Sequence, residues 1–369
     1  MKHLSYFSLI WLLIAGLSIS CTEIYTPDID APEGVLVVNA LITDQAGPYR
    51  ISLNYAQPYD SITGLKRIIN AGVFVTDDQG NRYDFSDAGA GEYLSDPESF
   101  TADTARVYTL NIETPDHSVY QSEPVKMIKT ATTESAYGIF SKRKFLIEDV
   151  DNTPLVEEKD WITIYLNTLV TGQNIPGIRF DPRLVVFSVY YLDPFGGGDV
   201  SPYYAWRTFY QDLRVISAGL TESKGSGGNT AFNDREISSF EYREFIKARD
   251  AYTEIDTMNS RILRYALILG QYQLNESSRI FYDDLTKQVQ SENRIFDPLP
   301  VDVRGNIRCT SDPSRKVIGL FEVSAYRETA YNIVTRKDSR EVTITPVDVM
   351  IPNPPLGSVP DVPPWFWIN

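Results

Sequence analysis

The chain has 369 residues, of which 43% are hydrophobic and 22% are charged, and its formal net charge at pH 7 is -15. This composition provides enough apolar residues for two globular domains and excludes a largely disordered chain. The strongly acidic balance repels phosphate backbones, so nucleic acid is excluded as a partner.

The first 20 residues have the layout of a secretory signal peptide. A short basic start precedes an apolar stretch from Leu4 to Ile19, with serines just before Cys21. The stretch falls short of the roughly 20 mostly apolar residues that a membrane-spanning helix needs, so we expect it to be cleaved. The letters LSISC resemble a bacterial lipoprotein signal, in which the cysteine becomes the lipidated first residue of the mature chain.

We therefore expect Cys21 to carry a lipid anchor that attaches the protein to a membrane. The alternative is an ordinary signal peptide cut nearby, which would leave Cys21 as a free thiol in an oxidising compartment. Thr22 follows the cysteine, and no aspartate stands there to indicate retention in the inner membrane. We therefore expect no retention in the inner membrane.

Residues 21–32 are polar and proline-marked, and we interpret them as a tether. From Val35 onward the pattern becomes strongly β, and the turn residues from Asp77 to Asn81 predict a hairpin. Seven short strands with a turn signal about every ten residues predict an immunoglobulin-like β-sandwich over residues 33–128. The residues expected to share its buried face include Tyr49, Ile51, Leu53, Tyr55, Tyr108, Leu110 and Ile112.

Residues 129–369 are expected to form a second, larger β-rich domain that ends in a tail rich in proline and aromatic residues. Residues 261–274 are interpreted as a strand because they alternate and contain a glycine. One α-helix is predicted at about residues 275–291, with Asn275 as its N-cap. The apolar residues expected on one strand face and on one helix stripe are Ile162, Ile164 and Leu166, and Phe281, Leu285 and Val289.

Several stretches occur in the same order as in a known protein family. They are LVVNALITDQAGPYRISL, AGVFVTDDQGNRYDF, GEYLSD, YTLNIETPDHSVYQS, PYYAWRTF, RIFDPLPVDVRGNIRC, VIGLFEVSAY and PPWFW. Together they resemble the Bacteroidota outer-membrane lipoproteins of domain of unknown function 4249 (DUF4249). The resemblance implies an accessory of a SusC-type TonB-dependent outer-membrane transporter. With the anchor at Cys21, it also implies a location in the outer membrane, on the extracellular face. Many relatives carry cysteines in the tail, where this chain has none, so a tail disulfide is not implied.

Residues suited to catalysis or metal binding are few. Cys309 and His117 are the only cysteine and the only histidine after Cys21, so neither a zinc site nor a nucleophile with a histidine base is expected. Cys309 is interpreted as a small buried residue. Asp283 and Asp284, an adjacent pair of acids, are placed on a solvated helix face. The run DVDNTPLVEE spaces oxygen ligands as a calcium loop does, but a proline stands where the bend needs glycine. No metal, no cofactor and no enzymatic activity are predicted.

Aromatic residues are the positive functional signal. The chain has 23 tyrosines, 17 phenylalanines and 5 tryptophans, and exposed rings anchor interfaces or stack on sugars and peptides. The alternative is that these rings fill the cores and edges of β-sheets. The candidates for binding a ligand or partner are Tyr203, Tyr204, Trp206, Phe209 and Tyr210 in a loop-to-strand segment, and Trp365, Phe366 and Trp367 in the tail.

The sequence thus predicts a lipoprotein that acts as a non-enzymatic binding or gating accessory of a TonB-dependent nutrient importer. Its second domain would capture a small ligand such as a peptide or glycan, and its first domain would serve as a spacer or docking surface. Two alternatives remain open. One is a structural or adhesive cell-surface lipoprotein, and the other is a hydrolase that uses two converging carboxylates.

Overall fold

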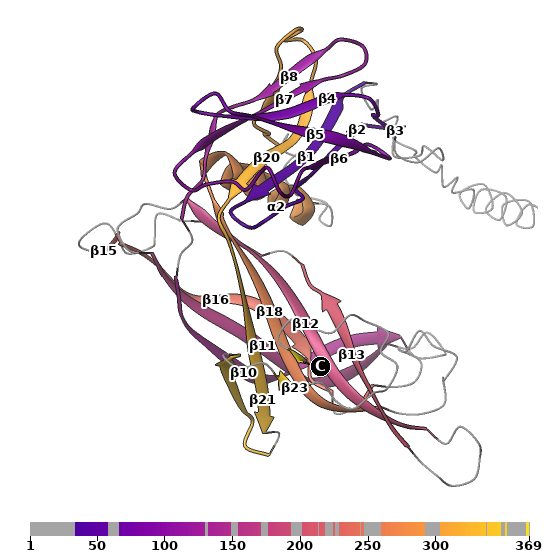
Figure 1. The fold of residues 1–369 in the computed structure, drawn as a ribbon. Coiled ribbons are helices and arrows are strands. Elements are labelled where there is room, and N and C mark those ends of the chain that lie inside the picture. The colour runs from indigo at the N-terminus through magenta and orange to yellow at the C-terminus, as the bar shows by residue number, and fades with distance from the viewer. Residues whose placement is uncertain are drawn as a thin grey trace, which may run out of the picture.

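The described residues of the computed structural model are mainly β, with the single helix α2 (Glu276–Ser291) inserted between strands (Figure 1). This confirms the prediction of a mainly β chain with one inserted helix. The immunoglobulin-like sandwich expected over residues 33–128 is instead a single rolled sheet, because two strands from beyond residue 300 complete it. No helix in the described ranges is both long and apolar enough to cross a membrane. The predicted signal peptide, the tether and Cys21 lie outside the described residues. The structure describes residues 34–57, 66–129, 132–148, 154–170, 176–192, 201–212, 214–217, 224–225, 229–243, 245–246, 260–291, 303–336, 338–347, 351–352 and 367–368.

The first sheet has 11 strands. They are β1 (Leu36–Thr43), β2 (Arg50–Tyr55), β3 (Lys66–Arg67), β4 (Gly72–Asp77), β5 (Arg82–Gly89), β6 (Glu92–Ser95), β7 (Val107–Glu113), β8 (Val119–Ser122), β9 (Val125–Lys126), β19 (Ile307–Cys309) and β20 (Val317–Ser324). The main path runs β19-β8-β7-β4-β5-β6-β2-β1-β20, with β3 beside β2 and β9 beside β7. The two end strands contact each other, so the sheet is rolled into a nearly closed barrel.

Period-two alternation builds one core inside this sheet. β2 buries Ile51 and Leu53, and β7 buries Leu110 and Ile112, as the sequence pattern predicts. β8 and β9 are separated at Pro124, because proline has no N–H to donate to the ladder.

The first sheet is completed by a segment from far along the chain. β20 lies parallel to β1, in register from Leu36 opposite Val317 onward, and β19 is antiparallel to β8. Asn306 joins the two ends of the sheet, because its Nδ2 donates to Phe321 O (2.9 Å) and its Oδ1 accepts from Phe321 N (2.9 Å). The boundary predicted at residue 128 therefore does not separate the first sheet from the rest of the chain.

The chain forms two lobes. The first lobe is the first sheet, and the second lobe contains a four-stranded and a seven-stranded sheet. The four-stranded sheet has the order β10 (Thr132–Glu148), β11 (Pro154–Val170), β16 (Asn229–Glu241) and β15 (Lys224–Gly225). The seven-stranded sheet has the order β13 (Ser201–Tyr210), β12 (Gly177–Leu192), β18 (Ser260–Leu274), β21 (Tyr326–Arg336) and β22 (Glu341–Pro346), with β14 (Arg214–Ser217) beside β12 and β17 (Phe245–Ile246) beside β18. A separate parallel pair consists of β23 (Ile351–Pro352) and β24 (Trp367–Ile368).

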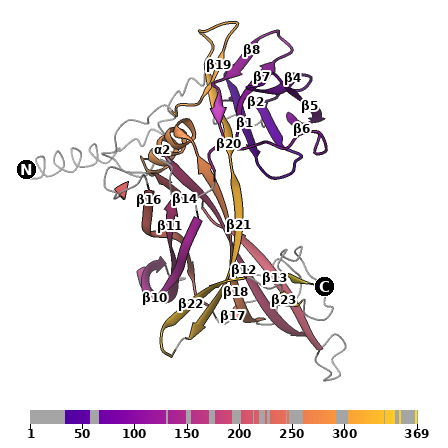
Figure 2. The ribbon, with the colours of Figure 1, turned by 60° about the vertical axis from the view of Figure 1, so that its left-hand side comes forward.

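The core of the second lobe lies between these two sheets, which form a sandwich. Ile164 and Phe232 from the four-stranded sheet join a cluster with Phe180, Leu267 and Ile333 from the seven-stranded sheet. The strands are long, and both views show them extending away from the first sheet (Figures 1 and 2). The two sheets also meet along one edge, where β10 of the four-stranded sheet contacts β22 of the seven-stranded sheet.

Helix α2 starts where the sequence predicts, because Asn275 Oδ1 accepts a hydrogen bond from Ser278 N (2.9 Å). Its buried face differs from the predicted apolar stripe: Leu285 is 38% exposed, whereas Asp284 is 1% exposed. The expectation that Asp284 faces solvent is therefore wrong. The physical reason is that Arg304 Nε donates to Asp284 Oδ2 (2.8 Å), which compensates the buried charge.

Helix α2 and strand β20 join the two lobes. α2 contacts β20 of the first sheet and β12, β14 and β18 of the seven-stranded sheet. Arg179 Nη2 in β12 lies 3.1 Å from Glu322 Oε1 in β20, and the Tyr282 hydroxyl of α2 donates to Glu322 Oε2 (2.6 Å). Both charged side chains are buried, so a single carboxylate ties the helix and the two lobes together.

Candidate functional site

The aromatic segment predicted to bind a ligand forms β13, at the end of the seven-stranded sheet. Phe209 is 41% exposed and Tyr210 is 79% exposed. The backbone of Tyr203, Tyr204 and Trp206 belongs to β13, but their side chains lie outside the described residues. Exposed rings on an edge strand suit a contact with a ligand or a partner, so this strand stays a candidate.

The tail aromatics are placed only in part. Trp367 belongs to β24, where its backbone pairs in parallel with Ile351 of β23. Trp365 and Phe366 lie outside the described residues. The structure therefore puts Trp367 and the aromatic segment of β13 in different sheets, and the binding role of the tail stays a prediction.

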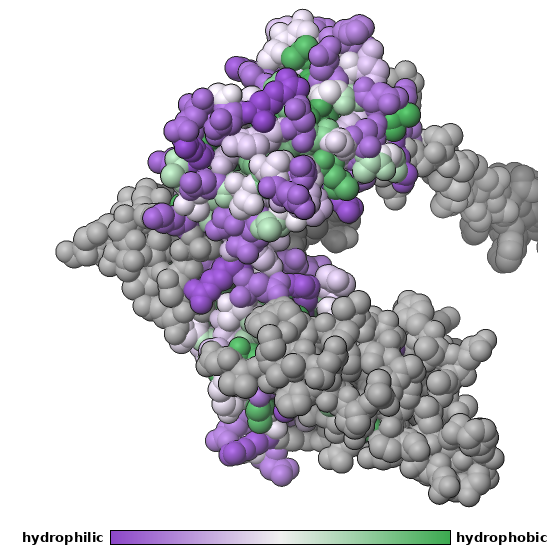
Figure 3. Space-filling model, viewed as in Figure 1, coloured by the Kyte–Doolittle hydropathy of each residue, from purple (hydrophilic) through white to green (hydrophobic). Residues whose placement is uncertain are grey.

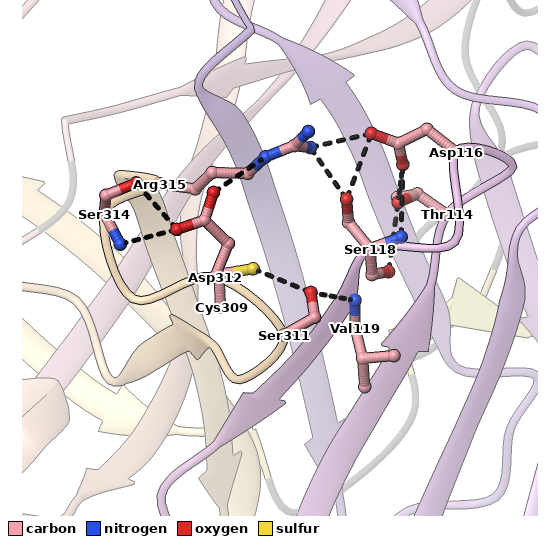
Figure 4. Close-up of polar contacts among 9 residues, drawn as sticks. All are labelled: Thr114, Asp116, Ser118, Val119, Cys309, Ser311, Asp312, Ser314 and Arg315. Atoms are coloured by element: carbon pink, nitrogen blue, oxygen red, sulfur yellow. Dashed lines mark hydrogen bonds and ion pairs between the residues drawn. The ribbon is translucent and has the colours of Figure 1, made fainter.

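A dense polar cluster lies at one end of the first sheet, between the turn that joins β7 to β8 and the loop between β19 and β20 (Figure 4). Arg315 Nη1 lies 2.7 Å from Asp116 Oδ2 and donates to Ser118 Oγ (2.7 Å). Thr114 Oγ1 donates to Asp116 Oδ1 (2.5 Å). Hydrogen bonds from Thr114 and Arg315 hold the pKa of Asp116 well below its usual range. This cluster fixes a turn and a distant loop to each other.

The residues with nucleophile or base chemistry also lie in the first sheet or its turns. Cys309 is buried, as predicted, and its Sγ lies 3.3 Å from Ser311 Oγ. His117 stands at the β7–β8 turn with a left-handed φ of 60°, and its side chain is 89% exposed. No group of three or more His, Cys, Asp or Glu side chains that could hold a metal ion occurs in the described part of the chain.

The strongest candidate site is a cavity of about 280 Å³ at a fork in the seven-stranded sheet. β18 and β21 pair up to Tyr265 opposite Ile333 and then separate. Further along the same edge of β18, β17 takes the vacated place, with Phe245 opposite Arg261. The cavity opens between these two pairings, and we call it the fork cavity. It is lined by Tyr242, Arg243, Ile262, Arg264, Tyr265 and residues 332–335.

An irregularity in the sheet coincides with the fork. The register between β12 and β18 shifts between Phe187 and Ser188, which stand opposite Arg264 and Ile262, so Leu263 is an extra residue in β18. A bulge of this kind bends its strand and increases the local twist. The bend accounts for the departure of β21 from β18 at this point.

Tyr265 fixes the wall of the fork cavity. Its ring is buried, its hydroxyl donates to Arg243 O (2.7 Å), and the same oxygen accepts a hydrogen bond from Arg243 N (2.9 Å). Burial raises the pKa of the Tyr265 phenol, so the hydroxyl keeps its proton at neutral pH. These two bonds hold the turn between β16 and β17 against β18.

The chemical character of the fork cavity is cationic and aromatic. Arg243 Nη2 lies 2.8 Å from Glu241 Oε2, whereas Arg264 has no ion-pair partner among the described residues. The rings of Tyr242 and Tyr265 and the side chain of Val334 supply apolar surface. A small space that combines rings, cations and apolar side chains is suited to binding a ligand.

The visible face of the first sheet has a different character. Its described surface is mostly hydrophilic, with small, separated hydrophobic areas (Figure 3). The described surface of the first sheet is typical of a solvent-exposed domain.

No residue that lines the fork cavity was among those predicted from the sequence. A signal was present, because Arg264 and Asn332 are polar residues inside the largely apolar runs ILRYALIL and AYNIV. A polar side chain within such a run is unusual, and departures of this kind are expected at functional or strained positions. The pattern does not show that these two strands are neighbours.

The chain was compared with curated proteins, with solved structures and with protein families. No curated protein matches the chain. One solved structure that aligns with it is described as "Structural basis for the promiscuous specificity of the carbohydrate-binding modules from the beta-sandwich super family". It is 10% identical, the alignment covers 56% of this chain and 94% of that one, and the TM-score of 0.13 is too low to support any argument.

A family comparison gives the more informative match. The family described as "Domain of unknown function (DUF4249)" matches residues 22–330. The matched range contains the first sheet, helix α2 and most strands of the second lobe, including β18 of the fork but only the first residues of β21. Because this match spans most of the sequence, the chain belongs to the DUF4249 family.

Proposed function

We propose that the protein is an outer-membrane lipoprotein, anchored through Cys21 on the extracellular face, that acts as a non-enzymatic binding or gating accessory of a SusC-type TonB-dependent nutrient importer. The observation that carries the binding role is the fork cavity, whose volume of about 280 Å³ fits a small ligand. The anchor rests on the apolar segment that ends at Cys21, and the importer rests on the family resemblance of the sequence.

In this proposal the two lobes have different tasks. The second lobe holds the ligand in the fork cavity, and the exposed rings of Phe209 and Tyr210 offer a further contact. The first lobe serves as a spacer or docking surface. A non-enzymatic role is supported by the placement of His117 at an exposed turn and of Cys309 in the core of the first sheet.

The direct test is affinity capture of the tagged, lipidated protein from mildly solubilised outer membranes, followed by mass spectrometry. We expect a TonB-dependent barrel in stoichiometric amount. If no barrel is captured under conditions that preserve known transporter complexes, the importer role is wrong.

The anchor is tested separately by Cys21→Ser. We expect the variant to lose its acyl chains and to move from the membrane fraction to the soluble fraction, because each buried methylene contributes about 0.8 kcal/mol of membrane affinity. Membrane retention equal to that of the parent would show that Cys21 is not the anchor.

One observation favours the second candidate, a structural or adhesive surface protein. β16 pairs with β11 only from Trp161 to Val170, so the outer end of the β10–β11 hairpin lies beyond it. There Leu146 is 74% exposed and Val156, opposite it, is 59% exposed. If this end contacts other cells or surfaces, Leu146→Ser with Val156→Ser should reduce cell adhesion while barrel capture stays unchanged.

A further inference from the structure

Of the two arginines that line the fork cavity, Arg243 has an ion-pair partner, whereas Arg264 has none among the described residues. Glu241 Oε2 lies 2.8 Å from Arg243 Nη2 and 3.6 Å from Lys159 Nζ, so one carboxylate serves two cations. Arg264 lines the cavity and is partly buried, and among the described residues it has no ion-pair partner. A guanidinium in such a place attracts an anion, and its planar fork of donors matches a carboxylate.

A second, independent feature is an unsatisfied acceptor. Asn332 Oδ1 is buried and has no hydrogen bond, and Asn332 lines the fork cavity. A buried carbonyl oxygen without a donor is unfavourable, so such a group is normally satisfied by water or by a ligand. A ligand that supplies an N–H or O–H to this oxygen would remove the penalty.

Part of the remaining wall is apolar. The Tyr242 ring and the side chains of Ile262 and Val334 line the cavity, and they offer a surface for a hydrocarbon face or a ring. A ligand that fits the whole space therefore combines an anionic group, a hydrogen-bond donor and an apolar face.

We propose that the fork cavity binds a small carboxylate ligand, with Arg264 pairing with the carboxylate and Asn332 Oδ1 accepting a hydrogen bond from an N–H or O–H of the same molecule. This inference rests on the proposed binding function and names its ligand class. The donor and the carboxylate occur together in acidic sugars and in N-acylated amino acids, which share the required chemistry.

The test is isothermal titration calorimetry of the lipidated full-length protein in detergent with two matched probe pairs. Galacturonic acid is compared with galactose, and N-acetyl-leucine is compared with its amide, so that each pair differs in the carboxylate. We expect at least one acid to bind and its neutral counterpart to bind at least about tenfold more weakly, as for the loss of a charge-assisted hydrogen bond. The acid that binds identifies the source of the ligand.

Variants locate the site. Arg264→Gln should weaken binding of the acid at least about tenfold, Arg264→Lys should restore part of it, and Asn332→Leu should weaken it to a smaller extent. The matched control is Arg308→Gln, an exposed arginine of β19 in the first sheet, which should bind like the parent. If Arg264→Gln does not fold, as judged by circular dichroism, the binding affinities of Arg264→Lys and Asn332→Leu test the site instead.

Three results would overturn the inference: no binding of either acid at millimolar concentration, equal binding of acid and neutral probe, or parental affinity in folded Arg264 and Asn332 variants. Barrel capture is measured on the same samples. A captured barrel without acid binding overturns only this inference, whereas acid binding without a captured barrel overturns only the importer role.

Discussion

At the scale of single residues, Tyr265 controls the shape of the fork cavity. We expect Tyr265→Phe to lower the free energy of unfolding by about 1–2 kcal/mol, because it removes both hydrogen bonds between the hydroxyl and the Arg243 backbone. Amide hydrogen exchange in the turn between β16 and β17 should become faster. Chemical denaturation and exchange measured by mass spectrometry check these two effects.

The matched control is Tyr210→Phe. Tyr210 is 79% exposed, so removal of its hydroxyl should change the free energy of unfolding by less than about 0.5 kcal/mol. Equal effects of the two substitutions would show that the hydroxyl of Tyr265 does not hold the turn.

Asp116 makes the stability of the first sheet depend on pH. Hydrogen bonds from Thr114 and Arg315 keep its pKa in the folded state below the unfolded value of about 4. The stabilisation is therefore fully present above about pH 4 and is lost as the pH falls toward the folded pKa. Solvent weakens the effect, because the Asp116 side chain is 42% exposed.

Asp116→Asn should therefore be less stable than the parent at neutral pH, and the difference should shrink at about pH 3. Urea denaturation at the two pH values measures it. Asp84→Asn is the control, because Asp84 is an exposed strand residue 2.7 Å from Arg82 and surface pairs of this kind contribute about 0–1 kcal/mol. A difference for Asp116→Asn that grows as the pH falls would contradict the assignment.

At the scale of elements, the pairing of β20 with β1 depends on Gly319. Its φ is +133°, and a Cβ added there would lie 1.9 Å from Val38 O in β1. We expect Gly319→Ala to push the strands apart and to lower the free energy of unfolding by about 3 kcal/mol or more. Thermal unfolding measures the loss, and hydrogen exchange in β1 locates it.

Gly72→Ala in β4 is the control for this prediction. Its added Cβ would meet the nearest atom, Glu113 Cβ, at 3.7 Å, which is ordinary van der Waals contact. The substitution should change stability by less than about 1 kcal/mol. Similar losses of stability in both variants would mean that Gly319 is not required for the close approach of β20 to β1.

Local sequence pattern predicts the elements well where one face is buried. α2 follows from its Asn275 cap, and the alternation in β2 and β7 identifies their buried residues. The pattern does not identify partners, because β20 has the same apolar character whether it pairs within the second lobe or with β1. The helix face was also missed, because Asp284 is buried through Arg304, which lies 20 residues away.

The candidate site shows the same limit. The exposed Phe209 and Tyr210 were singled out because aromatic residues cluster in one short segment, and the structure places both on an edge strand. The fork cavity arises where Arg264 and Asn332, on strands far apart in sequence, come together beside a bulge. The alternation of apolar and polar residues along one strand reveals neither the bulge nor the separation of β18 from β21.

At the scale of the whole molecule, the chain crosses between the lobes several times. β20 ends at Ser324 in the first sheet and β21 begins at Tyr326 in the second lobe, so only Ala325 separates them. The hydrogen bond from Gln273 N to Ala325 O (3.1 Å) adds a backbone link at this point. The lobes are therefore coupled by continuous strands and by the buried pair of Arg179 and Glu322.

This coupling gives the last prediction. Arg179→Met leaves the Glu322 carboxylate, which is 2% exposed, without its counter-ion, and such a loss costs about 3–5 kcal/mol. Adding Glu322→Gln removes the uncompensated charge and keeps an acceptor for Tyr282, so the double variant should recover part of the loss.

The measurement uses the distribution of tryptophans, since none of the described ones lies in the first sheet, whereas Trp161 and Trp206 belong to β11 and β13 of the second lobe. Tryptophan fluorescence therefore reports the second lobe, and hydrogen exchange of β1 and β7 reports the first. In the parent we expect both probes to give the same urea midpoint, because the buried pair and the shared strands make unfolding cooperative. In Arg179→Met the midpoints should fall and separate. Coincident midpoints at the parental urea concentration would show that the pair does not couple the lobes, and that the continuous strands alone hold them together.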